Sequence, residues 1–374
     1  MLDTTLVILC AGSSTRFQKN VKKQWLRIGN DPLWLVVSQR LSSYSDFAKV
    51  IIVGHKDELS YMKRFSSDFI YVAGGDTRQD SMKNALDNVE TEYVMVTDVA
   101  RSCVPKEVIL ELLEKRGMAD CIVPTIGVSD TVIYDGSVIN RDHTKLIQTP
   151  QLSKTKKLIK AVDTSYTFTD DSGAIKSNGG TICYIQGSLK SKKITFEEDL
   201  SDIECLKKPD LVYLNGNGFD IHPFVENKKM FLGGVFIDCG YGFKAHSDGD
   251  VLLHSLTDAL LGAAGAGDIG EFFPDTDMAY EGIDSKILLE QIVQFITNIG
   301  FEIVNIDITI VAQKPKITPY KEQIKGTIQK IVQIKPNFIN IKATTAEKLG
   351  FIGREEGVAV ISNATLKYYD WTKK

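Results

Sequence analysis

Side chains that could bind a metal ion are concentrated in the second half of the chain, which holds three of its five histidines. Asp220 and His222 are two residues apart, so on an extended strand both side chains lie on one face. Asp250, His254 and Asp258 follow at intervals of four, which on a helix gives one polar stripe. Asp220, His222 and His254 together would leave a fourth position open, as in catalytic zinc sites. The alternative is an ordinary hydrogen-bonded Asp–His pair.

Two polar residues precede this expected helix. Ser247 and Asp250 form a Ser-x-x-Asp pattern that predicts a helix N-terminus. At the mouth of the helix, His246 and Ser247 suit contact with a substrate better than metal binding. Asp250 or Asp258 is expected to orient His254 as a metal ligand.

A second candidate site lies at the start of the chain, where Thr5–Cys10 is an apolar run typical of a first strand. The small residues Ala11 and Gly12 follow and lead toward a helix. Such a turn is a natural phosphate cradle, because backbone N–H groups and the positive helix end point at the anion. Arg16 and Lys23 would add the cations that a triphosphate needs, although a solvated helix face is the alternative. The pattern is neither G-x-G-x-x-G nor a Walker loop.

The elements that must position these residues alternate along the first half of the chain. Strand-like runs occur at Lys49–Val53, Phe69–Ala73, Tyr93–Thr97 and Asp120–Pro124. Helical patterns lie between them at Leu33–Leu41, Gln79–Val89 and Lys106–Lys115. This alternation predicts an α/β fold with a Rossmann-like, doubly wound, mostly parallel sheet. Ligands of such sheets bind beyond the carboxyl ends of the strands.

Polar clusters fall where those strand ends are expected, at Gly74–Ser81, Thr97–Arg101 and Ser129–Thr131. Gly74 permits close approach of a base or ribose. Asp98, at the tip of an apolar strand, is a candidate magnesium ligand or else the N-cap of the next helix. Residues 131–147 alternate and turn at Asp135-Gly136, which predicts a hairpin arm that reaches a partner subunit.

The second half combines long helices with β–β returns. Helical patterns occur at Gly282–Ile299 and Pro319–Val332, and strand patterns at Ile303–Gln313, Phe338–Thr344 and Val358–Leu366. They predict an α+β sandwich of the ferredoxin-like type, with helices on one face of a mixed sheet. A chain of 374 residues fits two domains, and a short polar break places them at residues 1–210 and 211–374.

Composition excludes several functional classes. A net charge of −4 gives no basic footprint, so no nucleic-acid partner is expected. No apolar run approaches the ~20 residues of a membrane span. The six cysteines are scattered without a C-x-x-C pair, so neither disulfides nor a thiolate metal cluster is expected, and a cytoplasmic location is the default.

In order and spacing, residues 213–371 resemble 2-C-methyl-D-erythritol 2,4-cyclodiphosphate synthase. The motifs are Asp220/His222, His246-Ser247-Asp-Gly-Asp250, His254, Gly267-Asp268-Ile-Gly270, Phe273-Pro-Asp-Thr-Asp277 and Lys342–Phe351. The resemblance implies Zn²⁺ on Asp220, His222 and His254, a trimer with sites between subunits, and an attack of the substrate's 2-phosphate on its own β-phosphate that expels CMP. The CDP and Mg²⁺ site would comprise Lys316, Thr344, Thr345, Glu347, Phe351 and Arg354. Ala346 replaces a threonine common in this motif, which removes one hydroxyl.

Residues 3–208 resemble 2-C-methyl-D-erythritol 4-phosphate cytidylyltransferase, through Ala11–Arg16, Lys23-Gln24, Gly74–Ser81 and Lys193-Ile-Thr. The resemblance implies that the phosphate of methylerythritol phosphate attacks the α-phosphorus of CTP and expels pyrophosphate. Arg16 and Lys23 would stabilise the α-phosphate. The cytidine would be read by Gly74, Asp76 and Ser81, and the sugar phosphate held by Thr131, Arg141 and Lys193. Asp98 and Arg101 are retained, whereas Val99 and Ser102 depart from the common Asp-Ala-Ala-Arg-Pro.

Both families belong to the non-mevalonate isoprenoid pathway, with a kinase step between their reactions, so direct hand-over of product would require a third protein. A dimeric first domain and a trimeric second one would together favour a hexamer. One rival hypothesis is a nucleotidyltransferase for another sugar or alditol phosphate, joined to an unrelated zinc hydrolase. Another is a non-catalytic nucleotide sensor or scaffold. Release of pyrophosphate and CMP separates these hypotheses.

Overall fold

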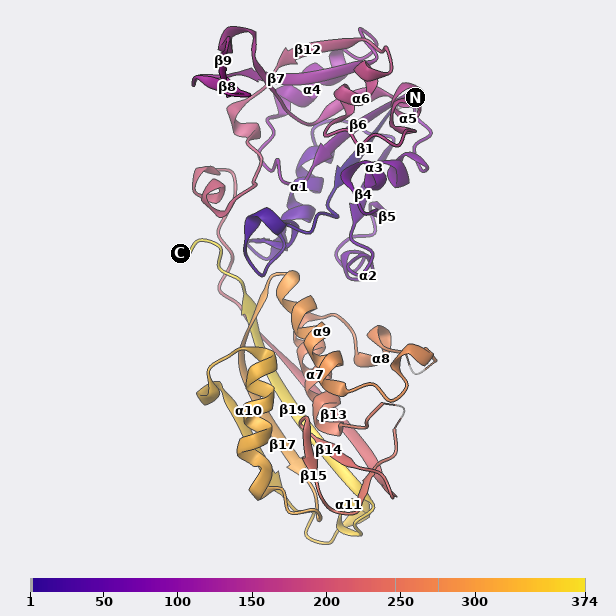
Figure 1. Cartoon of the computed structure of the whole chain (residues 1–374), viewed down its shortest axis with the longest axis vertical. Helices are drawn as coiled ribbons and strands as arrows, with labels where there is room; N and C mark the ends of the chain where they lie inside the picture. Colours follow the sequence, from indigo (N-terminus) through magenta and orange to yellow (C-terminus); the bar gives the residue numbers. More distant parts are fainter. Residues whose placement is uncertain (1–2, 246, 275, 374) are drawn as a thin grey trace. The chain divides into compact units, whose positions relative to one another are not determined.

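The computed structural model describes residues 3–245, 247–274 and 276–373, which form two compact units (Figure 1). The first unit comprises Met1–Pro209 and Asp370–Lys374, and the second comprises Asp210–Tyr369. The end of the chain belongs with the first unit because the indole Nε1 of Trp371 donates to the carbonyl of Arg27 at 2.7 Å.

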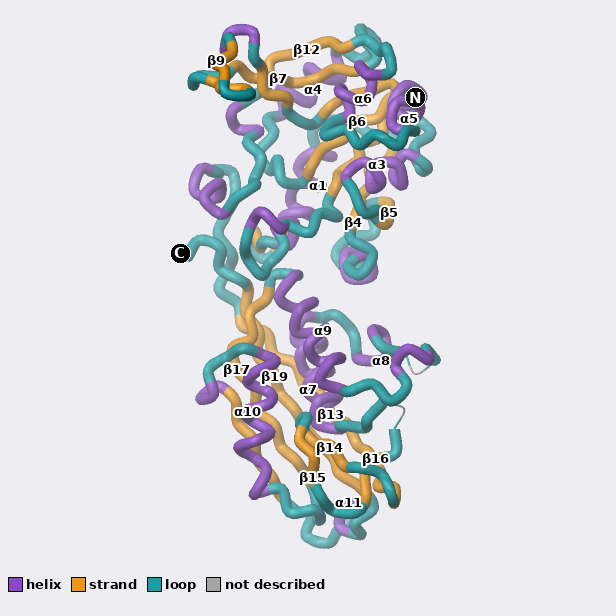
Figure 2. Tube along the Cα trace, in the orientation of Figure 1, coloured by secondary structure: helices purple, strands orange, loops and turns teal. Residues whose placement is uncertain are grey.

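An eight-stranded sheet organises the first unit (Figure 2). Its strands are β1 (Thr4–Leu9), β4 (Lys49–Gly54), β5 (Ile70–Ala73), β6 (Tyr93–Asp98), β7 (Cys121–Gly127), β10 (Lys145–Ile147), β11 (Gln151–Lys154) and β12 (Ile182–Gln186). They follow the order β10-β7-β11-β6-β1-β4-β5, with β12 also paired to β7. The pairs β1–β4, β1–β6, β4–β5 and β7–β12 are parallel, whereas β11 runs antiparallel to both neighbours. The carboxyl ends of β1, β5 and β6 therefore meet at one edge.

Both faces of this sheet are covered. The helices are α1 (Leu33–Ser42), α2 (Leu59–Met62), α3 (Arg78–Leu86), α4 (Lys106–Glu114), α5 (Thr155–Val162) and α6 (Asp171–Ser177). Val7 and Leu9 pack in one core with residues of α3, α5 and α6. Leu6 and Ile8, which point to the opposite face, are equally buried, so a second layer covers that face. The predicted Rossmann-like, doubly wound architecture is confirmed.

The predicted hairpin is present as β8 (Val132–Tyr134) and β9 (Ser137–Ile139). Asp135 and Gly136 form its turn with φ angles of 48° and 74°, the left-handed region that favours such residues. Ile133, Tyr134 and Val138 expose two thirds or more of their surface.

The expectation of no disulfide is wrong, because Cys103 and Cys205 are bonded, with their Cα atoms 5.9 Å apart. They are 102 residues apart in sequence, and spacing alone does not reveal that the fold brings them together. The side chain of Arg40 also joins the two segments, because it donates to the carbonyl of Ser102 at 2.7 Å and to that of Cys205 at 3.3 Å. The cysteine pattern therefore no longer argues for a reducing compartment.

A five-stranded sheet organises the second unit, in the order β16-β13-β19-β17-β18. Its strands are β13 (Tyr213–Glu226), β16 (Tyr241–Phe243), β17 (Phe301–Val311), β18 (Ile339–Thr344) and β19 (Gly357–Tyr368), beside the hairpin β14 (Met230–Leu232) and β15 (Val235–Ile237). Helices α7 (Val251–Ala264), α9 (Ser285–Asn298) and α10 (Lys321–Val332) lie on one face (Figure 1), with short α8 (Ile269–Phe272) and α11 (Gly350–Gly353) at the periphery. This confirms the predicted α+β sandwich.

Two glycines determine how closely α7 approaches β13. A β-carbon at Gly216 or Gly218 would collide with the carbonyl oxygens of Ala259 and Ser255 on α7. Because side chains alternate along a strand, Asp220 and His222 share the face of these glycines and point toward α7. The close packing therefore places the two side chains beside the helix.

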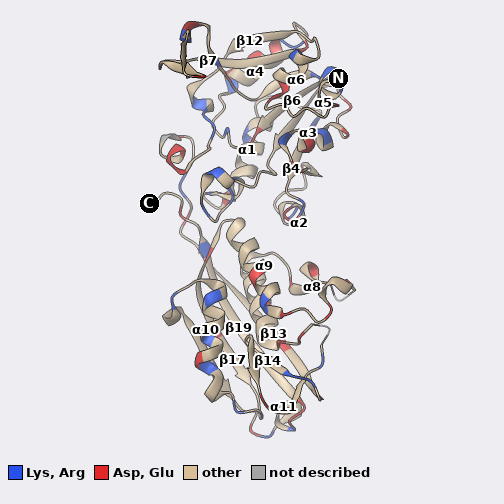
Figure 3. Cartoon of the chain, in the orientation of Figure 1, with Lys and Arg blue, Asp and Glu red and all other residues tan. Residues whose placement is uncertain are grey.

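Figure 3 shows Lys and Arg residues interspersed with Asp and Glu residues along the ribbon of each unit. Among the described helices, none is long and apolar enough to cross a membrane.

Candidate active sites

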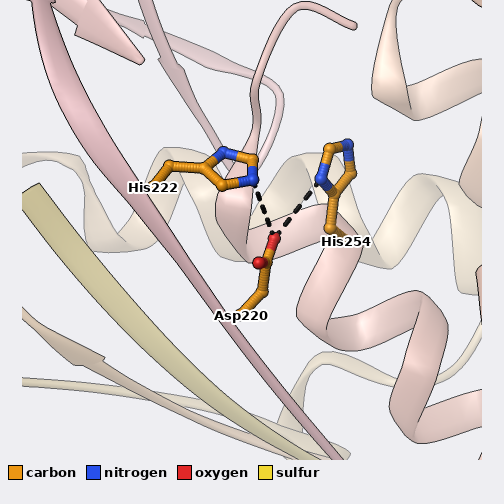
Figure 4. Close-up of side chains that lie close together, drawn as sticks. All are labelled: Asp220, His222 and His254. Atoms are coloured by element: carbon orange, nitrogen blue, oxygen red, sulfur yellow. Dashed lines mark ion pairs between the residues drawn. The ribbon is translucent and has the colours of Figure 1, made fainter. Parts of the chain in front are cut away.

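Asp220, His222 and His254 meet between β13 and α7 (Figure 4). Oδ2 of Asp220 lies 3.1 Å from Nε2 of His222 and 3.4 Å from Nδ1 of His254. One ligand atom from each residue falls within 4.8 Å of the others, so the group could hold a metal ion. The structure brings together the three residues that the sequence grouped, because both the strand period and the helix position were readable. Their binding of a metal ion stays a prediction.

A hydrogen bond to the backbone determines which ring nitrogen of His222 faces Asp220. Its Nδ1 lies 2.8 Å from the carbonyl oxygen of Gly249, which can only accept, so Nδ1 donates and Nε2 points to Asp220. Burial would lower the pKa of His222, but the hydrogen bond and charge of Asp220 raise it overall. Burial likewise opposes ionisation of Asp220, yet the two imidazoles hold its pKa well below the ordinary value. A carboxylate beside two imidazole nitrogens fits a divalent cation such as zinc.

The predicted stripe is present only in part, because His254 and Asp258 lie on α7 whereas Asp250 precedes the helix. Asp250 is the N-cap of α7, and its carboxylate accepts from Leu252 and Leu253 within the helix and from Gly233 and Gly234 outside it. Asp258 instead accepts from the N–H of Ile269 at 2.8 Å. Neither aspartate orients His254 by a hydrogen bond in the described structure, and Asp250, not Ser247, caps the helix.

The other residues predicted to contact the substrate near the metal group lie between residues 246 and 277. Ser247 places its hydroxyl 3.1 Å from Nε2 of His254. Phe273 is buried and packs on Tyr280 with ring centroids 5.3 Å apart. Asp268 and Asp277 cap short helices and Gly270 lies within α8, and all three are exposed. His246 lies outside the described residues.

The predicted CDP residues gather around the end of β18 and α11. Thr345 donates to Glu347 at 2.7 Å, and Arg354 is paired with Glu356. The whole set is exposed: Lys316, Thr344, Thr345, Glu347, Phe351 and Arg354. No hydrogen bond or ion pair joins these residues to the metal triad within the described chain.

In the first unit, a network of alternating charges lies at the carboxyl end of β6. The Asp98 carboxylate accepts from Arg78 at 3.0 Å and from Lys193 at 2.6 Å. Arg78 also donates to the fully buried Asp171 at 2.9 Å. Burial would raise the pKa of Asp98, but Arg78 and Lys193 hold it far below the ordinary value. Asp98 does not cap α4, whose N-cap is Pro105.

Arg78 and Asp171 were missed as functional candidates. Arg78 lies inside the recognised Gly74–Ser81 cluster, and its position at the first turn of α3, just after β5, could have marked it. The network also bears on the magnesium prediction. Both Asp98 oxygens have cationic partners, so a magnesium ion there would have to share the carboxylate with Arg78 and Lys193 or replace one of them.

Lys23 lies close to this network. Its ammonium group donates to the carbonyl of Ile194 at 3.0 Å, next to Lys193. Burial, followed by the charges of Lys193 and Arg16, lowers the pKa of Lys23 to about 8. Arg16 is exposed and has no hydrogen bond or ion pair among the described residues. Three cations thus face one region, which is an arrangement that favours an anionic ligand.

The predicted cradle is built by close backbone packing. A β-carbon on Gly74 would collide with that of Ala11, so the β1 loop and the β5 loop touch. The carbonyl of Gly12 accepts from Gln24 at 3.0 Å. Ser81 is buried and accepts from the N–H of Gly75 at 3.1 Å, whereas Asp76 is exposed.

The remaining predicted residues of the first unit form no hydrogen bond with Asp98 among the described residues. Arg101 donates to the carbonyls of Ser191 and Ile147. Thr131 and Arg141 are exposed on the arm around the β8–β9 hairpin, where Arg141 donates to the carbonyl of Ser129 at 2.7 Å. No described hydrogen bond or ion pair links Thr131 or Arg141 to Asp98 or Lys193.

Known proteins resemble the chain over its whole length. The family model for 2-C-methyl-D-erythritol 4-phosphate cytidylyltransferase matches residues 4–207, and that of the YgbB family matches residues 213–367. A bifunctional enzyme IspD/IspF from Aliarcobacter butzleri is 60% identical over 100% of both chains, and one from Campylobacter lari is 52% identical over 100% of both. The solved structure of the bifunctional IspDF from Campylobacter jejuni has 49% identity and a TM-score of 0.88, covering 99% of this chain and 100% of that one.

A cluster of cationic side chains on a doubly wound unit, and on an α+β unit an Asp–His–His group that could hold a metal ion, are typical of enzymes that act on phosphate esters. The chain belongs to the family of bifunctional IspD/IspF enzymes. It is a cytidylyltransferase and a cyclodiphosphate synthase of the non-mevalonate pathway. The corresponding prediction from sequence is confirmed.

Proposed function

We propose that the domain of residues 1–210 performs the cytidylyl transfer. Arg16 and Lys23 stabilise charge on the α-phosphate of CTP while the phosphate of methylerythritol phosphate attacks in line. Ala11, Gly12, Gly74, Asp76 and Ser81 surround the nucleotide. Arg101, Thr131, Arg141 and Lys193 hold the sugar phosphate, and Asp98 keeps Lys193 in place. The observation that supports this best is the convergence of Lys23, Lys193 and Arg16 beside the cradle.

We propose that the domain of residues 211–374 closes the cyclodiphosphate. Asp220, His222 and His254 would hold Zn²⁺, which would act as a Lewis acid toward a phosphate oxygen. His246 and Ser247 contact the substrate, together with Asp268, Gly270, Phe273 and Asp277. Thr345 lies nearest the reacting phosphates, and the CDP group rests on Lys316, Thr344, Glu347, Phe351 and Arg354. The convergence of one carboxylate and two correctly oriented imidazoles carries this proposal.

We further propose that the chain acts as a homo-oligomer in the cytoplasm, with Mg²⁺ accompanying the nucleotide at both sites. The exposed apolar residues of the β8–β9 hairpin support a dimeric contact. The lack of any described bond between the metal triad and the predicted CDP residues agrees with a site completed by a second subunit, as in a trimer, and together these contacts would give a hexamer.

Pyrophosphate release by the purified chain, with CTP and methylerythritol phosphate, tests the first assignment, with ATP and ribitol phosphate as substrate controls. The Arg16→Ala variant should lose on the order of a hundred- to a thousand-fold in turnover, as expected for removal of a charge-stabilising donor. Arg116→Ala is the matched control, because Arg116 pairs with Asp3 on the surface of the same domain. Unchanged turnover of the Arg16 variant would refute the role given to that residue.

A further inference from the structure

His254 is held on the side of its ring that faces away from Asp220. Its Nε2 lies 3.0 Å from the hydroxyl of Ser285 and 3.1 Å from that of Ser247. Ser285 is the first residue of α9, 31 residues further along the chain, and it is 1% exposed. A buried hydroxyl supplied by another helix thus contacts the imidazole opposite the metal-facing nitrogen.

Asp248 determines the direction of the Ser285 hydroxyl. Oδ1 of Asp248 lies 2.5 Å from Oγ of Ser285, and its Oδ2 accepts the N–H of Ser285 at 3.1 Å. An ionised carboxylate can only accept, so the hydroxyl hydrogen of Ser285 points to Asp248. The carboxylate is itself anchored, because the N–H of Asp250 donates to Oδ1 at 3.2 Å.

The oxygen of Ser285 therefore presents a lone pair to His254, and the imidazole must donate through Nε2. When the ring is neutral, its one proton is then on Nε2, and Nδ1 has a free lone pair for a metal ion that would lie between it and Asp220. The hydroxyl of Ser247 is compatible with this arrangement, because an oxygen that accepts from the N–H of Gly249 has a second lone pair that can accept from Nε2 of His254.

We propose that Ser285, oriented by Asp248, is a positioning residue that fixes the proton on Nε2 of His254 and so directs Nδ1 to the metal ion. The inference rests on the metal site proposed above. His222 is oriented by a similar hydrogen bond on its other nitrogen: the carbonyl of Gly249 accepts from Nδ1, which leaves Nε2 for the metal. Partners of this kind typically contribute ten- to a hundred-fold to metal affinity.

The first test measures zinc affinity of the full chain by competition with a chromophoric chelator. Ser285→Ala should bind zinc about ten- to a hundred-fold more weakly. Ser255→Ala is the matched control, since Ser255 follows His254 directly and its buried hydroxyl bonds only to Gly218, Val360 and Ser362. That control should keep wild-type affinity. Equal affinity of the Ser285 variant and the wild type, or an equal loss in the control, would overturn the proposal.

The second test reads the proton itself and does not depend on bound metal. Selective ¹⁵N labelling of the five histidines distinguishes protonated from unprotonated ring nitrogens by chemical shift. Nε2 of His254 should be protonated in the wild type with and without zinc, and Ser285→Ala should shift population toward the other tautomer. An unprotonated Nε2 in the wild type would contradict the inference. A wild-type chain that binds no zinc but has this proton would instead contradict only the proposed metal site.

Discussion

The lowered pKa of Lys23 makes the electrostatics of the first site measurable in a pH profile. Lys23 lies between Arg16 and Lys193, and its ammonium group is partly buried against the carbonyl of Ile194. Both effects favour the neutral amine, so the lysine can lose its charge close to physiological pH. A bound triphosphate reverses this balance, because its negative charge favours the ammonium form.

The rate constant kcat/KM for CTP should therefore decline above pH about 8, since this parameter reports the free enzyme. The decline in kcat should begin at higher pH, because the bound phosphates raise the pKa of Lys23. In Lys23→Arg the guanidinium stays charged, and the decline in kcat/KM over the same range should disappear. Pyrophosphate release across the pH range measures kcat/KM and kcat of the wild type and kcat/KM of the variant. A wild-type kcat/KM that stays constant well above pH 8 would exclude Lys23 as the titrating group.

At the scale of elements, the N-terminus of α7 joins three segments that define the metal site. Asp250 accepts two N–H groups of its own helix and two from the β14–β15 turn at Gly233 and Gly234. The preceding residue, Gly249, supplies the carbonyl that orients His222. One carboxylate thus holds the helix that carries His254 and the turn beside it.

Asp250→Ala should destabilise the second unit by roughly 3 kcal/mol, because a helix cap is lost and one buried and one partly buried N–H group are left unpaired. Asp284→Ala removes the cap of α9 and a surface ion pair with Lys286, and it should cost about 1 kcal/mol. All three tryptophans lie in the first unit, so urea unfolding followed by tryptophan fluorescence should be unchanged while the circular dichroism transition shifts. Equal losses in the two variants would show that the bonds to Gly233 and Gly234 contribute nothing.

Local patterns predicted the elements well, and contacts between distant segments account for the failures. The strand at Tyr93–Thr97 and the Asp220–His222 pair depend on alternation within a few residues. The role of Asp250 depends on Gly233 and Gly234, which no helical periodicity includes. The Cys103–Cys205 bond and the Arg78–Asp171 pair likewise join residues about a hundred positions apart, where sequence spacing gives no signal.

At the scale of the whole molecule, the candidate residues of each activity come from a different unit. Asp98, Lys193 and Lys23 belong to the first unit, and the metal triad belongs to the second. The chemistry of the two reactions is also separate, because a kinase step lies between them and the intermediate must leave the first site before it reaches the second. The two activities should therefore be removable one at a time.

His222→Ala should abolish zinc binding at the triad and CMP release, since a ligand is lost, and should leave pyrophosphate release within about two-fold of the wild type. Arg16→Ala should show the reverse, with pyrophosphate release reduced on the order of a hundred-fold or more and CMP release retained. Each variant is thus the control for the other in one preparation of the same chain. If a single substitution lowered both rates together, the fused domains would have to influence each other's sites, and independent assembly of the two activities would be excluded.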